Sequence, residues 1–186
     1  MRGILLVAKS ARLDAQGTTS TSQHRGVSRV VLNQGLPSAT PGWELSVRRV
    51  TFKSGARIPG EIHPGMQVVY IVSGTLNLKV LGGEAKVTRA KADSTQGAVE
   101  SFKPSPNEIV LKAGDTVLEP ETLVLAPRNA SNEPLVILAS SLLCVGQPPD
   151  QEPTQAQAPI CLLNTWIGID DTACDRYSNR SHSTEE

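Results

Sequence analysis

Residues 61–74 read EIHPGMQVVYIVSG, and this stretch decides the fold. A short polar segment around His63 leads into VVYIV, a β-branched and aromatic run that is typical of a buried strand. The dipeptide Ser73-Gly74 predicts a two-residue turn, and TLNLKV follows with alternating apolar and polar side chains. We therefore predict a β-hairpin whose first strand begins just after a histidine.

The strand pattern continues on both sides of this hairpin. Residues 43–52, WELSVRRVTF, alternate as a half-buried strand, with one slip near Arg48 and Arg49 that predicts a bulge. Downstream, EIVLKAGDTVLEP at 108–120 holds two short alternating strands around an Ala-Gly-Asp turn. LVILASSLLCV at 135–145 is almost continuously apolar, which predicts a strand buried on both faces. No part of this region requires a long helix, so the predicted fold class is all-β.

Three regions of the 186-residue chain differ in composition and in the periodicity of their apolar residues. Residues 1–40 form a predicted N-terminal extension that is partly disordered, and residues 41–146 form the predicted β-barrel. Within the barrel, residues 84–107 lack a sustained period and predict a long loop, either a lid or disordered. Residues 147–186 form a predicted Pro/Gln-rich linker and acidic tail. Inside that tail the apolar segment 160–169 is predicted to dock on the barrel or on a second copy of the chain.

Composition excludes several classes of partner and compartment. Eighteen basic residues balance eighteen acidic ones, so the chain lacks the basic surface that binds nucleic acid or an anionic membrane. The apolar run near the N-terminus is too short for a secretory or membrane segment. Its basic, Ser/Thr-rich start leaves an organelle transit peptide as the alternative to a frayed terminus. The three scattered cysteines indicate neither a disulfide framework nor a zinc site, which favours a reducing, cytoplasmic location.

Two spacings in the predicted barrel resemble the paired signatures of the cupin family. In the first, five residues separate Gly55 from Glu61, one separates Glu61 from His63, three separate His63 from Gln67, and six separate Gln67 from Gly74. The second signature is matched downstream in spacing, and in residue type at three positions, namely Gly114, Pro120 and Asn129. The resemblance implies a cupin-type jelly roll, a double-stranded β-helix like that of RmlC, with its ligand site inside the barrel.

The same resemblance identifies candidate ligand-binding residues. In cupins that bind a divalent metal, two His and one Glu of the first signature and one His of the second hold the ion. Glu61, His63 and Gln67 occupy the first three positions here, and Leu125 occupies the fourth. A carboxylate, an imidazole and an amide oxygen can still coordinate a cation, whereas leucine cannot. The degenerate set therefore predicts that no metal is held tightly, with a divalent transition metal at Glu61, His63 and Gln67 as the alternative.

Without a metal, these residues have simpler roles. His63 is then a partly buried histidine whose ring nitrogens form hydrogen bonds with Glu61 or Gln67. Leu125 then packs in the core and closes the inner wall of the pocket. The other two histidines, His24 and His182, lie in the predicted extensions, so any catalytic imidazole would be that of His63.

Three functions are compatible with the pattern. The leading hypothesis is a binding module that takes a small polar or carboxylate-bearing molecule into the barrel through Glu61, His63 and Gln67. The first alternative is a metal-dependent cupin enzyme, an isomerase, dioxygenase or lyase acting on a small metabolite. The second is an assembly protein that functions as a homodimer, with residues 160–169 crossing to the partner. No catalytic residue is identified from sequence.

Overall fold

The computed structural model describes residues 24–91 and 96–153. This part of the chain contains strands and no helix, which confirms the all-β prediction. The strands are β1 (Val27–Gly35), β2 (Trp43–Phe52), β3 (Gly65–Ser73), β4 (Thr75–Gly82), β5 (Ala85–Ala90), β6 (Gln96–Phe102), β7 (Ile109–Lys112), β8 (Thr116–Glu119), β9 (Val124–Arg128) and β10 (Leu135–Cys144).

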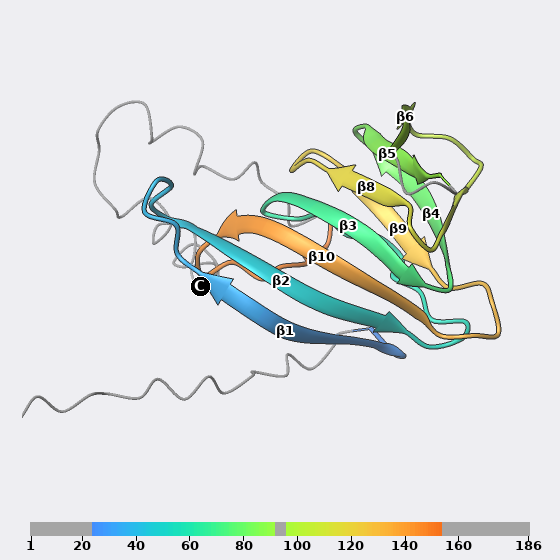
Figure 1. Ribbon diagram of the computed structural model, residues 1–186, viewed down its shortest axis with the longest axis horizontal. Helices are drawn as coiled ribbons and strands as arrows, with labels where there is room; N and C mark the ends of the chain where they lie inside the picture. The colour runs from blue at the N-terminus through green and yellow to red at the C-terminus, as the bar shows by residue number, and fades with distance from the viewer. Residues whose placement is uncertain (1–23, 92–95, 154–186) are drawn as a thin grey trace, which may run out of the picture.

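The strands form two antiparallel sheets that enclose one core. The larger sheet has the order β1-β2-β10-β3-β8-β5-β6, and the smaller has the order β7-β4-β9. Figure 1 shows β1, β2, β10 and β3 as long ribbons side by side. Alternate residues of each strand point inward, as in the buried positions of β3 and β4. Most inward side chains are aliphatic and pack together between the two sheets. The two sheets therefore form a jelly-roll sandwich.

The predicted hairpin at Ser73-Gly74 is wrong, because β3 and β4 belong to different sheets. The chain passes from one sheet to the other at Gly74, which has a φ of 83°. A Cβ atom there would lie 2.7 Å from the carbonyl oxygen of Pro134, so only glycine fits this corner. A two-residue turn signal thus marks a jelly-roll corner here, since local sequence does not show which strand is the hydrogen-bonding partner.

The predicted long loop at 84–107 is also wrong over most of its length. Residues 85–90 and 96–102 form the antiparallel pair β5–β6, and β5 also pairs with β8. Ala85 and Val87 are fully buried, whereas β6 is largely exposed at the edge of the sheet. The pair was missed because only β5 carries an apolar side chain pattern toward the core.

The sheet begins before residue 41, contrary to the predicted domain boundary. Strand β1 pairs along its length with β2, and its Val27 and Arg29 are buried. The bulge predicted in residues 43–52 lies instead in β1, between Val31 and Asn33, while β2 pairs with β10 in continuous register. Arg48 produced the apparent slip because it occupies an inward position of β2 and lines the barrel interior.

Strand β10 is central in the larger sheet, but it is buried on one face only. Its inward positions are buried, whereas its other face is partly exposed, so the prediction of burial on both faces is wrong. At its end, Cys144 is disulfide-bonded, which the scattered cysteines did not indicate. Within the described residues, no helix has the length and apolar character of a membrane span.

Asn129 ties together the chain segments at one end of the barrel. Its side chain is 1% exposed, and its amide nitrogen donates to the carbonyl oxygens of Phe52, Lys53 and Glu133 at 3.2, 3.3 and 2.7 Å. Its amide oxygen accepts a hydrogen bond from the backbone of Ser131. These bonds stabilise the fold because the Asn129 amide is buried and needs protein partners in place of water.

Replacing Asn129 by aspartate should destabilise the protein strongly. The Asn129→Asp variant points a carboxylate at three carbonyl oxygens, and we expect a loss of about 3 kcal/mol or more in the free energy of unfolding. Urea denaturation measures this loss. Asn132→Asp makes the same chemical change at an exposed neighbour and should cost little. Equal effects of the two variants would contradict a structural role for the Asn129 amide.

Candidate functional site

The segment between β2 and β3 delivers Glu61 and His63 to the barrel interior. Glu61 exchanges two backbone hydrogen bonds with Leu125 of β9, at 2.8 and 3.0 Å. Ile62 exchanges two with Gln151, both at 3.0 Å. The segment therefore behaves as a short strand, and the alternation of its side chains places Glu61 and His63 on one side. Both are buried, with exposed fractions of 7% and 4%.

Gln67 is the centre of a buried hydrogen-bond network. It lies at an inward position of β3, and its amide nitrogen is 2.6 Å from Oε2 of Glu119 and 2.7 Å from Nε2 of His63. Its amide oxygen accepts a hydrogen bond of 2.9 Å from the hydroxyl of Ser141 on β10. The amide thus links side chains from three strands and the Glu61 segment. Glutamine suits this position because one planar group supplies both two donors and an acceptor.

Both ring nitrogens of His63 contact protein groups. Nδ1 donates to the carbonyl oxygen of Pro149 at 2.7 Å and lies 3.6 Å from Oδ1 of Asp150. Nε2 faces Gln67 and is 3.5 Å from Oε2 of Glu119. A neutral ring accepts a hydrogen bond from the Gln67 amide at Nε2. A protonated ring instead points its Nε2 hydrogen toward Glu119 and requires the Gln67 amide to turn its oxygen to the ring.

Sequence reasoning missed four charged residues of this site. Arg29 of β1 is buried, and its Nε lies 2.8 Å from Oδ2 of Asp150, while its NH2 group lies 3.6 Å from Oε2 of Glu61. Arg48 of β2 and Glu119 of β8 line the same interior. The available signal was a charged residue at an inward position of an otherwise alternating strand, as at Arg29, Arg48 and Glu119. No such signal marked Asp150, which lies beyond the last strand.

These side chains surround a cavity of about 40 Å³ inside the barrel. Apolar side chains also line it, among them Leu125, which occupies the fourth position of the resembled metal set. A volume of this size holds about three water molecules. Seven polar or charged residues line it, namely Arg29, Arg48, Glu61, His63, Gln67, Glu119 and Asp150.

Burial and mutual charge shift the acid–base equilibria of the site. Burial raises the pKa of the Glu61 carboxyl to about 8, against the opposing influence of His63 and Arg29. Burial lowers the pKa of His63, but its hydrogen bond with Glu119 and the charges of Glu61, Glu119 and Asp150 outweigh burial and raise this pKa to about 9. Oε2 of Glu61 is fully buried and has no hydrogen-bond partner. This carboxyl is therefore the group that an added ligand, water or ion can satisfy.

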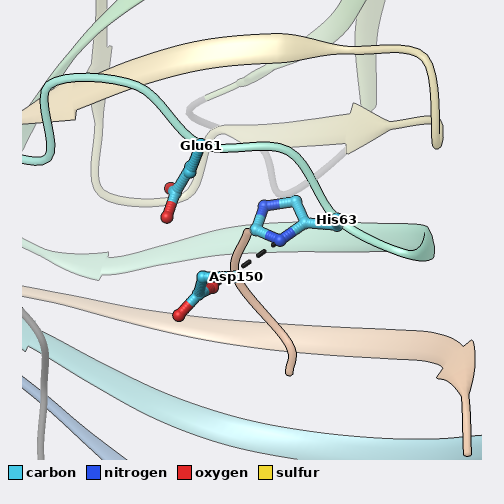
Figure 2. Close-up of side chains that lie close together, drawn as sticks. All are labelled: Glu61, His63 and Asp150. Carbon is cyan, nitrogen blue, oxygen red and sulfur yellow. Dashed lines mark ion pairs between the residues drawn. The ribbon is translucent and has the colours of Figure 1, made fainter. Parts of the chain in front are cut away.

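The side chains that could hold a metal differ from the set that the resemblance implied. One donor atom each from Glu61, His63 and Asp150 lies within 4.8 Å of the others. Figure 2 shows these side chains converging, with Asp150 entering from the segment after β10. Two carboxylates and one imidazole suit a divalent cation. Gln67, the third residue of the predicted set, contacts His63, Glu119 and Ser141.

The same donors already have protein partners. His63 Nδ1 donates to Pro149, and Asp150 pairs with the guanidinium of Arg29. A cation between Glu61, His63 and Asp150 would replace the first contact and stand close to a positive charge. Donor identity thus fits a metal, and binding one would exchange some of these protein contacts for the ion.

Comparison with known proteins yields matches to solved structures alone. Neither a family model nor a curated protein matches this chain. Similar solved structures include an RmlC-like cupin from Shewanella frigidimarina, with 16% identity, a TM-score of 0.43, and coverage of 75% of this chain and 95% of that one. A cupin-2 domain from Rhodospirillum rubrum has 18% identity, a TM-score of 0.43, and coverage of 96% of each chain. The polyketide cyclase RemF from Streptomyces resistomycificus has 12% identity, a TM-score of 0.45, and coverage of 90% and 98%.

The two antiparallel sheets form a jelly roll, which is the fold that the two signatures predicted. At these identities the likeness concerns the fold, and no activity is carried over from the similar structures. Gly74 and Asn129 of the two signatures have structural roles in the barrel, whereas Glu61, His63, Gln67 and Leu125 lie around its cavity.

Several sequence predictions stay untested. The apolar segment 160–169, through which a homodimer was predicted, lies outside the described residues. The cytoplasmic location, the small-molecule partner and the exclusion of nucleic acid also stay predictions. Residues 147–153, the described part of the predicted linker, pack against the Glu61 segment.

Stability should fall as the pH rises, because Glu61 and His63 both bind protons more tightly in the folded chain. The contribution of His63 is complete below its ordinary pKa of 6.5 and is lost as the pH rises through about 9. The penalty for ionising buried Glu61 grows between pH 4.5 and about 8. We expect the free energy of unfolding, measured by urea denaturation, to drop on the order of 2 kcal/mol between pH 6.5 and 9.

Two variants assign this pH dependence to its sources. Glu61→Gln should reduce the drop below pH 8, and His63→Gln should reduce it up to pH 9. A stability that stays level or rises between pH 6.5 and 9 in the unsubstituted protein would contradict the raised pKa values.

Proposed function

We propose that the chain is a binding protein that takes a small polar metabolite into its barrel without a tightly held metal. The buried Oε2 of Glu61 carries this proposal. It lies 3.6 Å from the Arg29 guanidinium but has no hydrogen-bond partner in the described chain, and a carboxyl in a polar cavity needs one. His63 and Gln67 line the same cavity and give a ligand further polar contacts when it replaces one of their present protein partners.

Two observations favour a metal-free site. Leu125 stands at the fourth position of the resembled set and is 1% exposed, so it contributes packing and no donor atom. Gln67 is neutral and forms hydrogen bonds with His63, Glu119 and Ser141. The charge and ligand count available to a divalent ion are therefore lower than in a set of three imidazoles and a carboxylate.

The second candidate function is that of a metal-dependent enzyme, and the convergence of Glu61, His63 and Asp150 favours it. These three residues would hold the ion, which would supply a Lewis acid to a bound substrate. In this candidate, Asp150 replaces the histidine that the resemblance places at the position of Leu125.

A ligand screen in the presence of a chelator tests the leading proposal. Small hydroxy acids, keto acids and sugars are added to the full chain with EDTA, and the melting temperature is measured. A ligand at 100 times its dissociation constant should stabilise the fold by about 2.7 kcal/mol, equivalent to a rise of about 5 to 10 °C. Gln67→Leu should abolish the rise. Met66→Leu, a change on the outward face of the same strand, should retain it.

Elemental analysis decides between the two candidates. The protein is purified without a histidine tag or chelator, and its transition metals are quantified. We expect far less than one ion per chain. A content near one per chain that disappears in both His63→Ala and Asp150→Asn would replace the leading proposal with the metal-dependent one.

A further inference from the structure

Residues 147–153, here called the strap, form part of the cavity wall although they follow the last strand. Backbone hydrogen bonds between Ile62 and Gln151 fix the strap beside the Glu61 segment, with both distances 3.0 Å. Pro149 and Asp150 of the strap line the cavity. The other lining residues come from the strands or from the segment between β2 and β3. The strap belongs to neither sheet, so it can move without breaking a strand pairing of the barrel.

The strap contacts two groups at this end of the cavity, the Arg29 guanidinium and the His63 ring. Asp150 gives Arg29 an ion pair of 2.8 Å, and the carbonyl oxygen of Pro149 accepts the Nδ1 hydrogen of His63 at 2.7 Å. The second carboxylate oxygen of Asp150 lies 3.6 Å from the same His63 nitrogen. Arg29 is buried, and its remaining acidic neighbour, Glu61, is 3.6 Å away. A carboxylate from the chain itself thus occupies the position in which an anionic ligand would meet Arg29 and His63.

The charges of the cavity favour a carboxylate over a more highly charged anion. Arg29 and Arg48 supply positive charge, but Glu61 and Glu119 lie in the same enclosure. A phosphate dianion would meet repulsion from the Glu119 carboxylate, whereas the raised pKa of Glu61, about 8, leaves that carboxyl mostly uncharged at neutral pH. A planar monoanion matches the guanidinium geometry at lower cost. The group that now fills this position is itself a carboxylate.

The size of the cavity sets a second condition. Its volume of about 40 Å³ accommodates a few water molecules, and a metabolite of ordinary size needs more room. Displacing the strap provides this room and frees Arg29 and His63 at the same time.

We propose that Arg29 and His63 form a carboxylate-binding subsite, that Asp150 fills it as an internal stand-in, and that a ligand carboxylate enters by displacing the strap. This inference rests on the proposed function, since it concerns the same cavity. The strap then competes with the ligand, and the measured affinity equals the intrinsic affinity multiplied by the fraction of molecules with the strap displaced.

Acetate is the probe for this subsite, because it carries the carboxylate and little else. The full chain is titrated with sodium acetate at constant ionic strength, with sodium chloride as the reference, and His63 ring resonances are followed by NMR. Asp150→Asn should bind acetate at least tenfold more tightly than the unsubstituted protein. Glu152→Gln, which neutralises an exposed acid of the strap, should bind as the unsubstituted protein does. Adding Arg29→Gln to Asp150→Asn should abolish the gain.

Hydrogen exchange in the unsubstituted protein provides a second test that does not depend on the folding of a variant. Saturating acetate should accelerate exchange of the Ile62 and Gln151 amide hydrogens, which join the strap to the barrel. The amides of Glu61 and Leu125, paired in a bridge of the same kind, should keep their protection. Acetate that binds while the Ile62 and Gln151 amides stay protected would overturn displacement of the strap.

The remaining outcomes separate this inference from the proposed function. Equal or weaker acetate binding by Asp150→Asn overturns the subsite, and a metabolite that still stabilises the chelated protein leaves the proposed function standing. Loss of a stoichiometric metal in Asp150→Asn also overturns it, because Asp150 would then be a metal ligand. If no metabolite stabilises the protein but acetate binds as expected, the subsite is supported and its physiological ligand lies outside the screen.

Discussion

A buried guanidinium requires a counter-charge, and partly buried Asp150 supplies it to Arg29. The two residues lie at opposite ends of the described chain. Arg29 lies in the first strand, and Asp150 lies beyond the last one. Loss of either partner would leave an uncompensated charge in a poorly hydrated interior. The pair therefore brings the two ends of the described chain to the same cavity, where Glu61 and His63 come from a segment near the middle.

The fold could be predicted from sequence because its signals are local or depend on spacing. Alternation and turn residues located β2, the turn before β8 and the corner at Gly74. Strand partners could not be predicted in the same way, and the β3–β4 hairpin failed because two consecutive strands pair in different sheets. The β5–β6 pair failed because β6 buries little, so hydrogen bonding with β5 forms it without an apolar pattern.

The site was predictable in part, for a related reason. Glu61, His63 and Gln67 were identified because a known spacing marks them, and they do surround one cavity. The role of the Gln67 amide as a link between His63 and Glu119 depends on a contact between residues 52 positions apart. Arg29 and Asp150 are still farther apart in sequence. No pattern in either segment shows that their side chains meet, since only the folded chain brings them together.

Residues 147–153 contribute to the wall of the cavity but take no part in the strand pairing that forms the barrel. Every strand and its register can stay the same while the sequence of this segment changes, yet two cavity-lining residues change with it. Among chains with this architecture, selectivity can therefore diverge through a short peptide after the last strand, without a loss of core packing.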